Sequence, residues 1–239
     1  MSKITRYWAI IPAAGVSQRM GSDVPKQYLL LRDTMVIENS LDCFLRHPKV
    51  VGVVVALHAD DQHWNNLSIT RDGKIHTVIG GKSRAESVSN AIQYLDNTAA
   101  EEQDFVLVHD AARPCLRYSD LDLLIQKLEA DEVGGILAAP VSDTLKLVSE
   151  DAQGSNYVSE TLDRSKVWRA LTPQMFRLKA LKKAIAYCSK NSIHVTDEAS
   201  AIEALGLPVK LVKGQSDNIK ITHAEDIDLA AAIVTKIKQ

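Results

Sequence analysis

The chain has 239 residues, of which 46% are hydrophobic and 24% charged, a composition typical of a globular domain with a core of its own. Its formal net charge of −2 argues against broad electrostatic binding of nucleic acid. No apolar run approaches the ~18 residues that span a membrane, and the apolar stretch near the N-terminus is too short for a secretory signal. We therefore expect a cytoplasmic protein with no membrane partner.

Short β-type runs alternate with amphipathic helical runs along most of the chain. Apolar runs bounded by polar residues predict strands, and apolar residues at spacings of three and four predict helices. The predicted strands cover 7–12, 50–57, 74–79, 105–108 and 133–140, and the predicted helices cover 35–46, 84–95, 119–130 and 224–237. Such continuous apolar strands separated by helices indicate an α/β protein with a largely parallel sheet covered on both faces.

Residues 143–164 break this rhythm, because apolar and polar residues alternate there on both sides of the polar stretch SEDAQGSN. That pattern predicts a β-hairpin and not a strand–helix unit. A two-stranded hairpin is marginal in water by itself, so a protruding one needs a surface to pack on. We expect an arm that packs against a second subunit. The alternative is an antiparallel extension of the main sheet.

The three cysteines, Cys43, Cys115 and Cys188, are odd in number and far apart. Their spacing fits neither a disulfide framework nor a zinc site. They are expected to be reduced, mostly buried thiols.

The first candidate site follows the first strand, in the string IIPAAGVSQRMGSDVPKQY. Ala13, Ala14 and Gly15 have minimal side chains, which lets backbone N–H groups approach an anion closely. Arg19 and Lys26 add two cations to the same loop. Arginine can clamp phosphate oxygens through two bonds and lysine acts as a point charge, so this loop suits a triphosphate. The string matches neither the P-loop pattern nor the GxGxxG pattern.

The second candidate site is the string VLVHDAARP. Asp110 comes just after a buried strand, at the carboxyl edge where open α/β sheets bind ligands. Its carboxylate could bind Mg²⁺ shared with phosphates, or it could cap a helix. Arg113 either shapes the loop or contacts phosphate. His109 is expected to be structural, because phosphoryl transfer depends on positioning and charge neutralisation more than on a general base.

The third string, VIGGKSRAESVSNAI, places Gly80 and Gly81 in a turn with Ser87 one turn into the next helix. Two glycines permit close backbone approach, and a hydroxyl can read a base edge. The pattern by itself is weak, since many strand-to-helix turns look the same.

The C-terminal half carries single polar residues at junctions between elements. They are Arg164, Thr172, Thr196 and Lys220. Thr196 precedes two acidic residues and could equally start a helix.

Taken together, the strings PAAG, PKQY, HDAARP, LTPQ, TDEASA and DNIK occur in this order between about Ala9 and Ala230. In these motifs the chain resembles the 2-C-methyl-D-erythritol 4-phosphate cytidylyltransferase family. The resemblance implies a Rossmann-like three-layer sandwich forming a single domain over 1–239, with the arm 143–164 inserted. It also implies a homodimer formed through that arm and a divalent cation, usually Mg²⁺. The implied reaction is attack of the methylerythritol phosphate oxygen on the α-phosphorus of CTP, giving CDP-methylerythritol and pyrophosphate.

The resemblance also assigns roles. Arg19 and Lys26 would stabilise charge on the triphosphate, whereas Arg164 and Lys220 would position the attacking phosphate. The implied substrate-binding residues are Pro12, Ala13, Ala14, Gly15, Gly81, Ser87, Asp110, Arg113, Thr144, Thr172 and Thr196, with Asp110 beside the metal. Thr144 and Arg164 would reach the site from the partner's arm.

Two positions depart from the family's pattern. Ser17 replaces a glycine of the phosphate loop, and Lys82 stands where an acidic residue is common. If cytosine is read by the backbone at Lys82, base choice is preserved; if it is read by the side chain, CTP selectivity changes. The two preceding glycines favour the backbone.

Rival functions are a ribitol 5-phosphate cytidylyltransferase, a nucleotidyltransferase for a hexose phosphate, and a nucleotide-binding module without catalysis.

Overall fold

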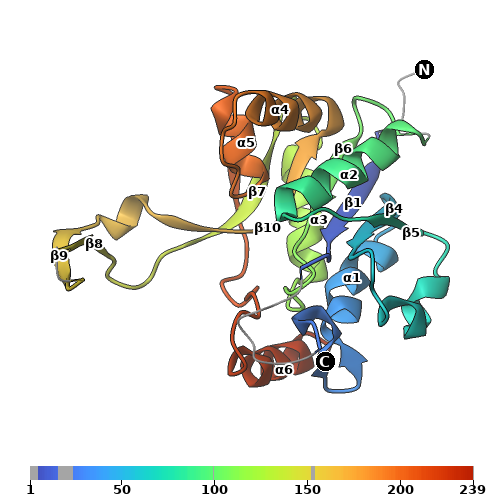
Figure 1. Cartoon of the computed structure of the whole chain (residues 1–239), viewed down its shortest axis with the longest axis horizontal. Helices are drawn as coiled ribbons and strands as arrows, with labels where there is room; N and C mark the ends of the chain where they lie inside the picture. Colours follow the sequence, from blue (N-terminus) through green and yellow to red (C-terminus); the bar gives the residue numbers. More distant parts are fainter. Residues whose placement is uncertain (1–4, 16–23, 99, 152–153, 239) are drawn as a thin grey trace.

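The computed structural model describes residues 5–15, 24–98, 100–151 and 154–238. In this part of the chain, seven strands form one sheet in the order β11-β7-β10-β6-β1-β4-β5 (Figure 1). The strands are β1 (Tyr7–Pro12), β4 (Val50–Leu57), β5 (Ile75–Ile79), β6 (Phe105–Val108), β7 (Gly134–Pro140), β10 (Trp168–Arg177) and β11 (Lys210–Lys213). Only β10 runs antiparallel to its neighbours among these described strands, which confirms a mostly parallel sheet.

Helices cover both faces of the sheet. One face packs against α2 (Arg84–Asp96), α4 (Leu178–Lys190) and α5 (Glu198–Ala204), and the other against α1 (Val36–Arg46) and α3 (Tyr118–Leu128). Alternate residues of β1 serve the two faces, because Ile10 lies in the core cluster of α2 and Ile11 in the cluster of α1. Both side chains are fully buried, as a strand covered on two sides requires. The predicted three-layer α/β sandwich is confirmed.

A third, smaller cluster ties the end of the chain to its beginning. α6 (Asp226–Ile237) buries Ala230 and Val234 against Leu31 and Val36, together with Ile221 from the segment that precedes the helix. The short strands β2 (Leu30–Leu31) and β3 (Thr34–Met35) pair beside it. This packing brings the segment before α6 next to the loop that follows β1.

The predicted elements agree with the structure within two residues at either end. The strands at 7–12, 50–57 and 105–108 have the predicted bounds. The elements that were not predicted are β2, β3, β10, α4 and β11, and a helix near α5 was considered only as the alternative at Thr196. The described residues also form short 3-10 helices, which are η2 (Lys26–Tyr28), η3 (Trp64–Asn66), η4 (Ser68–Arg71) and η5 (Arg164–Lys166). All three cysteines are buried and free, as expected.

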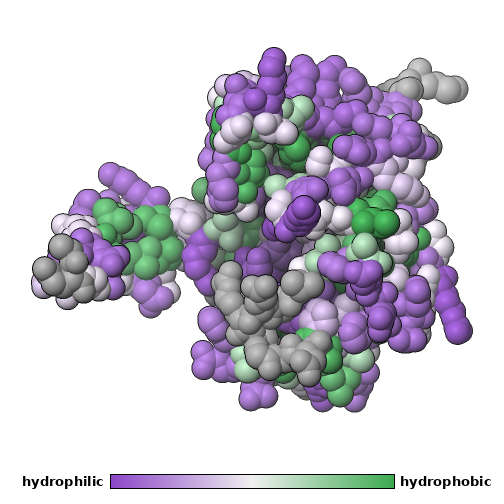
Figure 2. Space-filling model, viewed as in Figure 1, coloured by the Kyte–Doolittle hydropathy of each residue, from purple (hydrophilic) through white to green (hydrophobic). Residues whose placement is uncertain are grey.

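The hairpin prediction for 143–164 is confirmed. β8 (Lys146–Glu150) and β9 (Asn156–Thr161) form a separate two-stranded sheet that projects from the body of the molecule, so the alternative of an extended main sheet is wrong (Figure 1). Figure 2 shows a hydrophobic patch on this projection. Four large apolar side chains of β8 and β9 are between 50% and 61% exposed: Leu147, Val148, Tyr157 and Val158.

Membrane insertion through a helix finds no support in the described residues, since none of their helices is long and apolar enough to cross a bilayer.

Candidate active site

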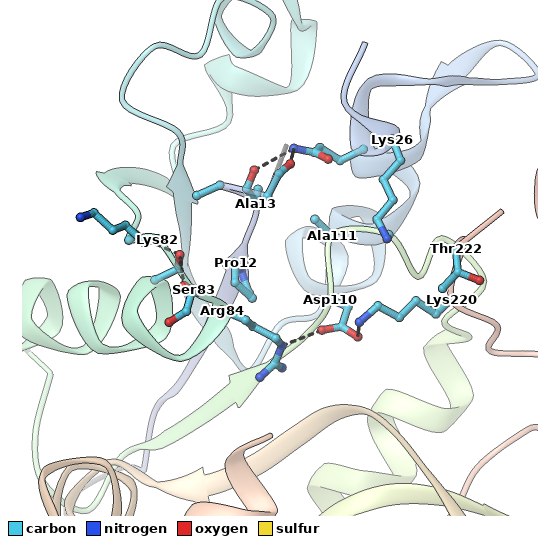
Figure 3. A pocket seen from close by; sticks show the side chains of 16 residues that line it. Pro12, Ala13, Lys26, Lys82, Ser83, Arg84, Asp110, Ala111, Lys220 and Thr222 are labelled. Carbon is cyan, nitrogen blue, oxygen red and sulfur yellow. Dashed lines mark hydrogen bonds and ion pairs between the residues drawn. The ribbon is translucent and has the colours of Figure 1, made fainter. Parts of the chain in front are cut away.

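A cavity of about 720 Å³ lies at the carboxyl edge of β1 and β6 (Figure 3). That volume falls in the range of roughly 300–1,000 Å³ common for small-molecule sites. The position is also the usual place for ligands in open α/β sheets. Its lining comes from the loop after β1, η2, the start of α2, the loop after β6 and the segment before α6.

The start of the loop after β1 is held in place by a buried amide. Ala13 N donates to the carbonyl of Ala56 in β4 at 2.8 Å. Gln27, only 4% exposed, donates its Nε2 to the carbonyls of Ala13 at 2.8 Å and Gly15 at 3.2 Å. Gln27 thereby fixes the carbonyls of Ala13 and Gly15. Gln27 lies in the PKQY string, but sequence reasoning did not assign it a role.

Two lysines from opposite ends of the chain converge on the cavity. Lys26 donates its Nζ to the carbonyl of Ile221 at 3.0 Å, and the neighbouring Lys220 places its Nζ 3.0 Å from Asp110 Oδ2. The segment that carries Lys220 is itself fixed, because Ile221 N donates to the carbonyl of Ala112 at 2.9 Å. The predicted association of Lys26, Asp110 and Lys220 is therefore present in the geometry.

Asp110 lies at the centre of three cations. Its Oδ1 accepts from Arg84 Nε at 2.9 Å, and its Oδ2 faces Arg113 Nε at 3.2 Å as well as Lys220. Burial alone would raise the pKa of Asp110, but the charges of these cations outweigh burial and hold the pKa well below its usual range. The carboxylate therefore remains ionised and keeps three cationic side chains aimed at one point.

Under this loop lies a buried hydrogen-bond chain. His109 Nε2 is 3.0 Å from the carbonyl of Arg113, which can only accept, so Nε2 carries the proton. Nδ1 therefore accepts from the hydroxyl of Thr172 at 2.9 Å, and Thr172 Oγ1 accepts from Asp110 N at 3.2 Å. Burial lowers the pKa of His109 to about 4, so the ring is neutral near pH 7. This placement fits the structural role expected for His109. The hydroxyl of Thr172 is engaged in hydrogen bonds with His109 and with Asp110 N.

The glycine turn closes the opposite side of the cavity. Gly80 N donates to the carbonyl of Leu57 at 2.7 Å, Gly81 N to Ser87 Oγ at 3.0 Å, and Lys82 N to Glu86 Oε2 at 2.8 Å. The N–H groups of this turn are thus satisfied internally. A base that used them would first displace Ser87 or Glu86.

A Cβ at Gly80 would lie 2.6 Å from Ala14 Cβ and 2.9 Å from Ser87 Oγ. Real Cβ atoms do not come that close to their neighbours, so the two loops touch only because residue 80 is glycine.

Most of the predicted site residues share the cavity. Its lining includes Pro12, Ala13, Ala14, Gly15, Lys26, Gly81, Ser87, Asp110 and Lys220. Arg113 and Thr172 lie beneath it, where Arg113 donates to the carbonyl of Asn218 at 2.7 Å and Asn218 donates to the carbonyl of Thr172 at 2.7 Å. Arg19 and Ser17 lie outside the described residues.

Three predicted residues do not line the cavity of this chain. Thr144 and Arg164 are exposed at the base of the arm, where Arg164 donates to the carbonyl of Ser142 at 2.7 Å. Thr196 is exposed before α5, and the alternative of a helix start there is displaced by one residue, because Asp197 is the N-cap. Asp110 does not cap a helix either, since the segment after it forms a turn.

Sequence reasoning missed several residues that line the cavity. They are Gln27, Ser83, Arg84, Ala111, Ala112 and Thr222, whereas Lys82, which was singled out for its bearing on base choice, also lines the cavity. Arg84 is the most consequential of them. A cation at the first position of a helix that follows a glycine turn is a usable signal. The interpretation of this string rested on the two glycines and Ser87 and gave Arg84 no role.

A mostly parallel sheet, a small-residue loop at its carboxyl edge and cations gathered around one buried carboxylate define an α/β nucleotidyltransferase. The sequence model of the family IspD, 2-C-methyl-D-erythritol 4-phosphate cytidylyltransferase, matches residues 7–236 of this chain. The chain belongs to this family.

Relatives and solved structures agree with that assignment. A 2-C-methyl-D-erythritol 4-phosphate cytidylyltransferase of Pseudomonas putida (strain GB-1) is 51% identical over 228 residues, covering 95% of each chain. One from Pseudomonas savastanoi pv. phaseolicola is 50% identical over 93% of this chain and 92% of its own. The crystal structure of the Francisella tularensis enzyme of the same name superposes with a TM-score of 0.82 at 35% identity, covering 96% of this chain and all of that one.

Proposed function

We propose that this protein transfers CMP from CTP to 2-C-methyl-D-erythritol 4-phosphate, releasing pyrophosphate and forming CDP-methylerythritol. The observation that carries the proposal is the convergence of Lys26, Lys220 and Asp110 on one cavity beside the Ala13–Gly15 loop. The names of relatives that are about half identical over nearly the whole chain supply the substrates.

The reaction brings two anions together, so its main obstacle is charge repulsion. An oxygen of the acceptor's phosphate forms a bond to the α-phosphorus, and the bond from that phosphorus to the β-phosphate bridging oxygen breaks. Arg19 and Lys26 would neutralise the triphosphate side, where charge develops on the departing pyrophosphate. Lys220, held beside Asp110, would bind the acceptor phosphate and keep its oxygen in line with the α-phosphorus.

A divalent cation, which the family generally requires, fits this site if the nucleotide brings most of its ligands. Within the described residues there is no group of three or more His, Cys, Asp or Glu side chains that could hold a metal ion. Among the residues that the structure describes, Asp110 Oδ1 accepts from Arg84, and a carboxylate oxygen has room for a further partner, so this oxygen could share an ion with phosphate oxygens and water. We propose Mg²⁺ in this position, where it would offset triphosphate charge.

We propose further that the arm joins two copies of the chain, and that the arm of each copy completes the active site of the other. The apolar side chains exposed on β8 and β9 need a cover, and Arg164 and Thr144 at the arm's base lie outside their own chain's cavity. Light scattering should report a dimer. A stable, fully active monomer would remove this part of the proposal.

Complementation tests the same idea through activity. Lys26→Ala and Arg164→Ala chains should each be impaired alone. After co-refolding of equal amounts, mixed dimers would hold one intact site each, so about a quarter of wild-type activity should return. If Arg164 acts within its own chain, mixing restores nothing.

The function itself is tested by pyrophosphate release with Mg²⁺ across CTP, UTP, ATP and GTP. Each nucleotide is paired with methylerythritol phosphate, ribitol 5-phosphate and a hexose 1-phosphate. We expect release with CTP and methylerythritol phosphate. Preference for either other acceptor would identify a rival transferase, and CTP binding without release under all conditions would indicate a binding module.

A further inference from the structure

Arg84 joins three parts of the molecule that are distant in sequence. It is the first residue of α2, immediately after the glycine turn. Its Nε donates to Asp110 Oδ1 at 2.9 Å, and its two terminal nitrogens donate to the two oxygens of Glu198 at 2.7 and 2.9 Å. One planar guanidinium therefore fixes the loop after β6 and the start of α5 relative to α2. Figure 3 shows Arg84 reaching across the cavity floor to Asp110, opposite Lys220.

Both carboxylates that Arg84 binds are buried. Glu198 is 3% exposed and Asp110 is 7% exposed. Buried carboxylates are strongly disfavoured as ions unless a cation and hydrogen bonds compensate them. Asp110 has Arg113 and Lys220 as additional cations, whereas the ion pairs of the described residues give Glu198 only Arg84. The position of Glu198 therefore depends chiefly on this one guanidinium.

The start of α5 is held from a second side by β10. Gln174 donates its Nε2 to Asp197 Oδ2 at 2.9 Å and accepts from Ala199 N at 2.9 Å. Gln174 thus ties α5 to the sheet, and Arg84 ties it to the glycine turn. Thr196, one of the residues that the family resemblance implies in substrate binding, directly precedes this doubly held helix start.

We infer that Arg84 is a positioning residue that aligns the nucleotide side of the cavity, formed by the glycine turn, with the acceptor side, formed by Asp110 and the start of α5. The inference rests on the proposed function, because it assigns one substrate to each side. Arg84 acts here through Asp110 and Glu198. If so, the spacing of the two bound substrates depends on the hydrogen bonds of this guanidinium, with Gln174 supporting the start of α5 from the sheet.

The fork requires arginine. Three N–H groups of one rigid plane point in set directions toward two carboxylates, whereas a lysine ammonium is a flexible point charge. Arg84→Lys keeps the positive charge but loses the simultaneous hydrogen bonds to Asp110 and Glu198. Glu198→Gln keeps the shape and loses the charge of the other partner. The two variants therefore break the same connection from its two ends.

The experiment measures kcat, the KM of CTP and the KM of methylerythritol phosphate for wild type, both single variants and the double variant. Each single variant should lose at least about tenfold in kcat while both KM values stay within about threefold, since misalignment impairs reaction more than binding. The double variant should be no slower than the slower single variant, because both substitutions remove one connection. Arg46→Lys, which alters an exposed arginine–aspartate pair on α1, is the matched control and should retain wild-type constants.

Single-variant kcat values within threefold of wild type would overturn the inference, as would losses that multiply in the double variant. A rise in either KM with unchanged kcat would also overturn it, since Arg84 would then serve binding alone. Thermal unfolding shows whether each variant folds. If Arg84→Lys does not fold, the near-isosteric Glu198→Gln decides by the same kcat criterion. Absence of turnover in the wild type, by contrast, would refute the proposed function before any variant is compared.

Discussion

Replacing Asp110 by Asn should destabilise the protein strongly, although the side chain keeps its size. The carboxylate accepts from Arg84 through Oδ1 and faces Arg113 and Lys220 through Oδ2, all between 2.9 and 3.2 Å. In the variant one of these oxygens becomes an NH2 group, which turns donor hydrogens toward cations. The three cations also lose the charge that holds them together.

Breaking a buried ion pair by removing one partner costs about 3–5 kcal/mol. For a chain of this size each kcal/mol lowers Tm by about 2–4 °C, so Asp110→Asn should unfold about 10 °C below wild type. Asp42→Asn is the control, because Asp42 pairs with Arg46 on the surface and such helix pairs contribute about 0.3–0.5 kcal/mol. Its Tm should fall by no more than about 2 °C.

The pH dependence of this difference follows from the lowered pKa of Asp110. A group whose pKa is lower in the folded state contributes stability above its unfolded pKa, which is about 3.9 for aspartate. Below that pH the unfolded chain takes up a proton that the folded chain does not. The stability gap between wild type and Asp110→Asn should therefore be full at pH 7 and narrow as the pH falls below about 4. Chemical denaturation of both proteins at pH 7 and at a pH below about 4 measures this stability gap. A gap no larger than that of Asp42→Asn at pH 7 would refute the charge argument.

Three further predictions concern the cavity and the residues that support it. Lys26→Ala should lower kcat for pyrophosphate release by roughly 10²–10³, as for loss of one preorganised donor, and a change under threefold would contradict its role. Gly80→Ala should raise the KM of CTP and cost about 1–3 kcal/mol, because the new Cβ meets Ala14 and Ser87, whereas Gly73→Ala has open space and should be tolerated. Thr172→Val should cost about 1–3 kcal/mol in denaturant unfolding, because it leaves Asp110 N without the hydroxyl it donates to inside the protein; an unchanged midpoint would show that this contact is dispensable.

The layers of the fold could be predicted from the sequence because burial on both faces imposes long apolar runs. β1, β4 and β6 have such runs, and their predicted bounds agree with the structure. β10 could not be predicted in the same way. It is buried from Leu171 to Phe176, yet this part carries Thr172, Pro173 and Gln174, which interrupt the apolar run. Thr172 and Gln174 form hydrogen bonds with Asp110 and the start of α5. The polar residues that support the site therefore interrupt the apolar pattern by which a buried strand is recognised.

Site residues that lie together in one short string could be predicted from the sequence. Site residues whose partners are distant in the sequence were missed. Lys26 and Asp110 lie in compact strings with recognisable turns, and both line the cavity. The partnership of Arg84 with Glu198 spans 114 residues, and no local pattern marks it. Periodicity favoured a plain helix start at Arg84, since a residue at the first helical position usually needs no other explanation.

Charge explains why the site contains two buried carboxylates although its substrates are anions. Arg84, Arg113 and Lys220 repel one another, and without a counter-charge they would turn toward solvent. Asp110 pairs with all three of them, and Glu198 pairs with Arg84. Three cations against two carboxylates still leave one positive charge in this group, and Lys26 lines the same cavity. The protein therefore offers incoming phosphates an array whose directions are set beforehand, and little reorientation is left for the moment of reaction. Loss of either carboxylate would increase the positive charge and yet slow the enzyme, which a site built on net attraction alone would not do.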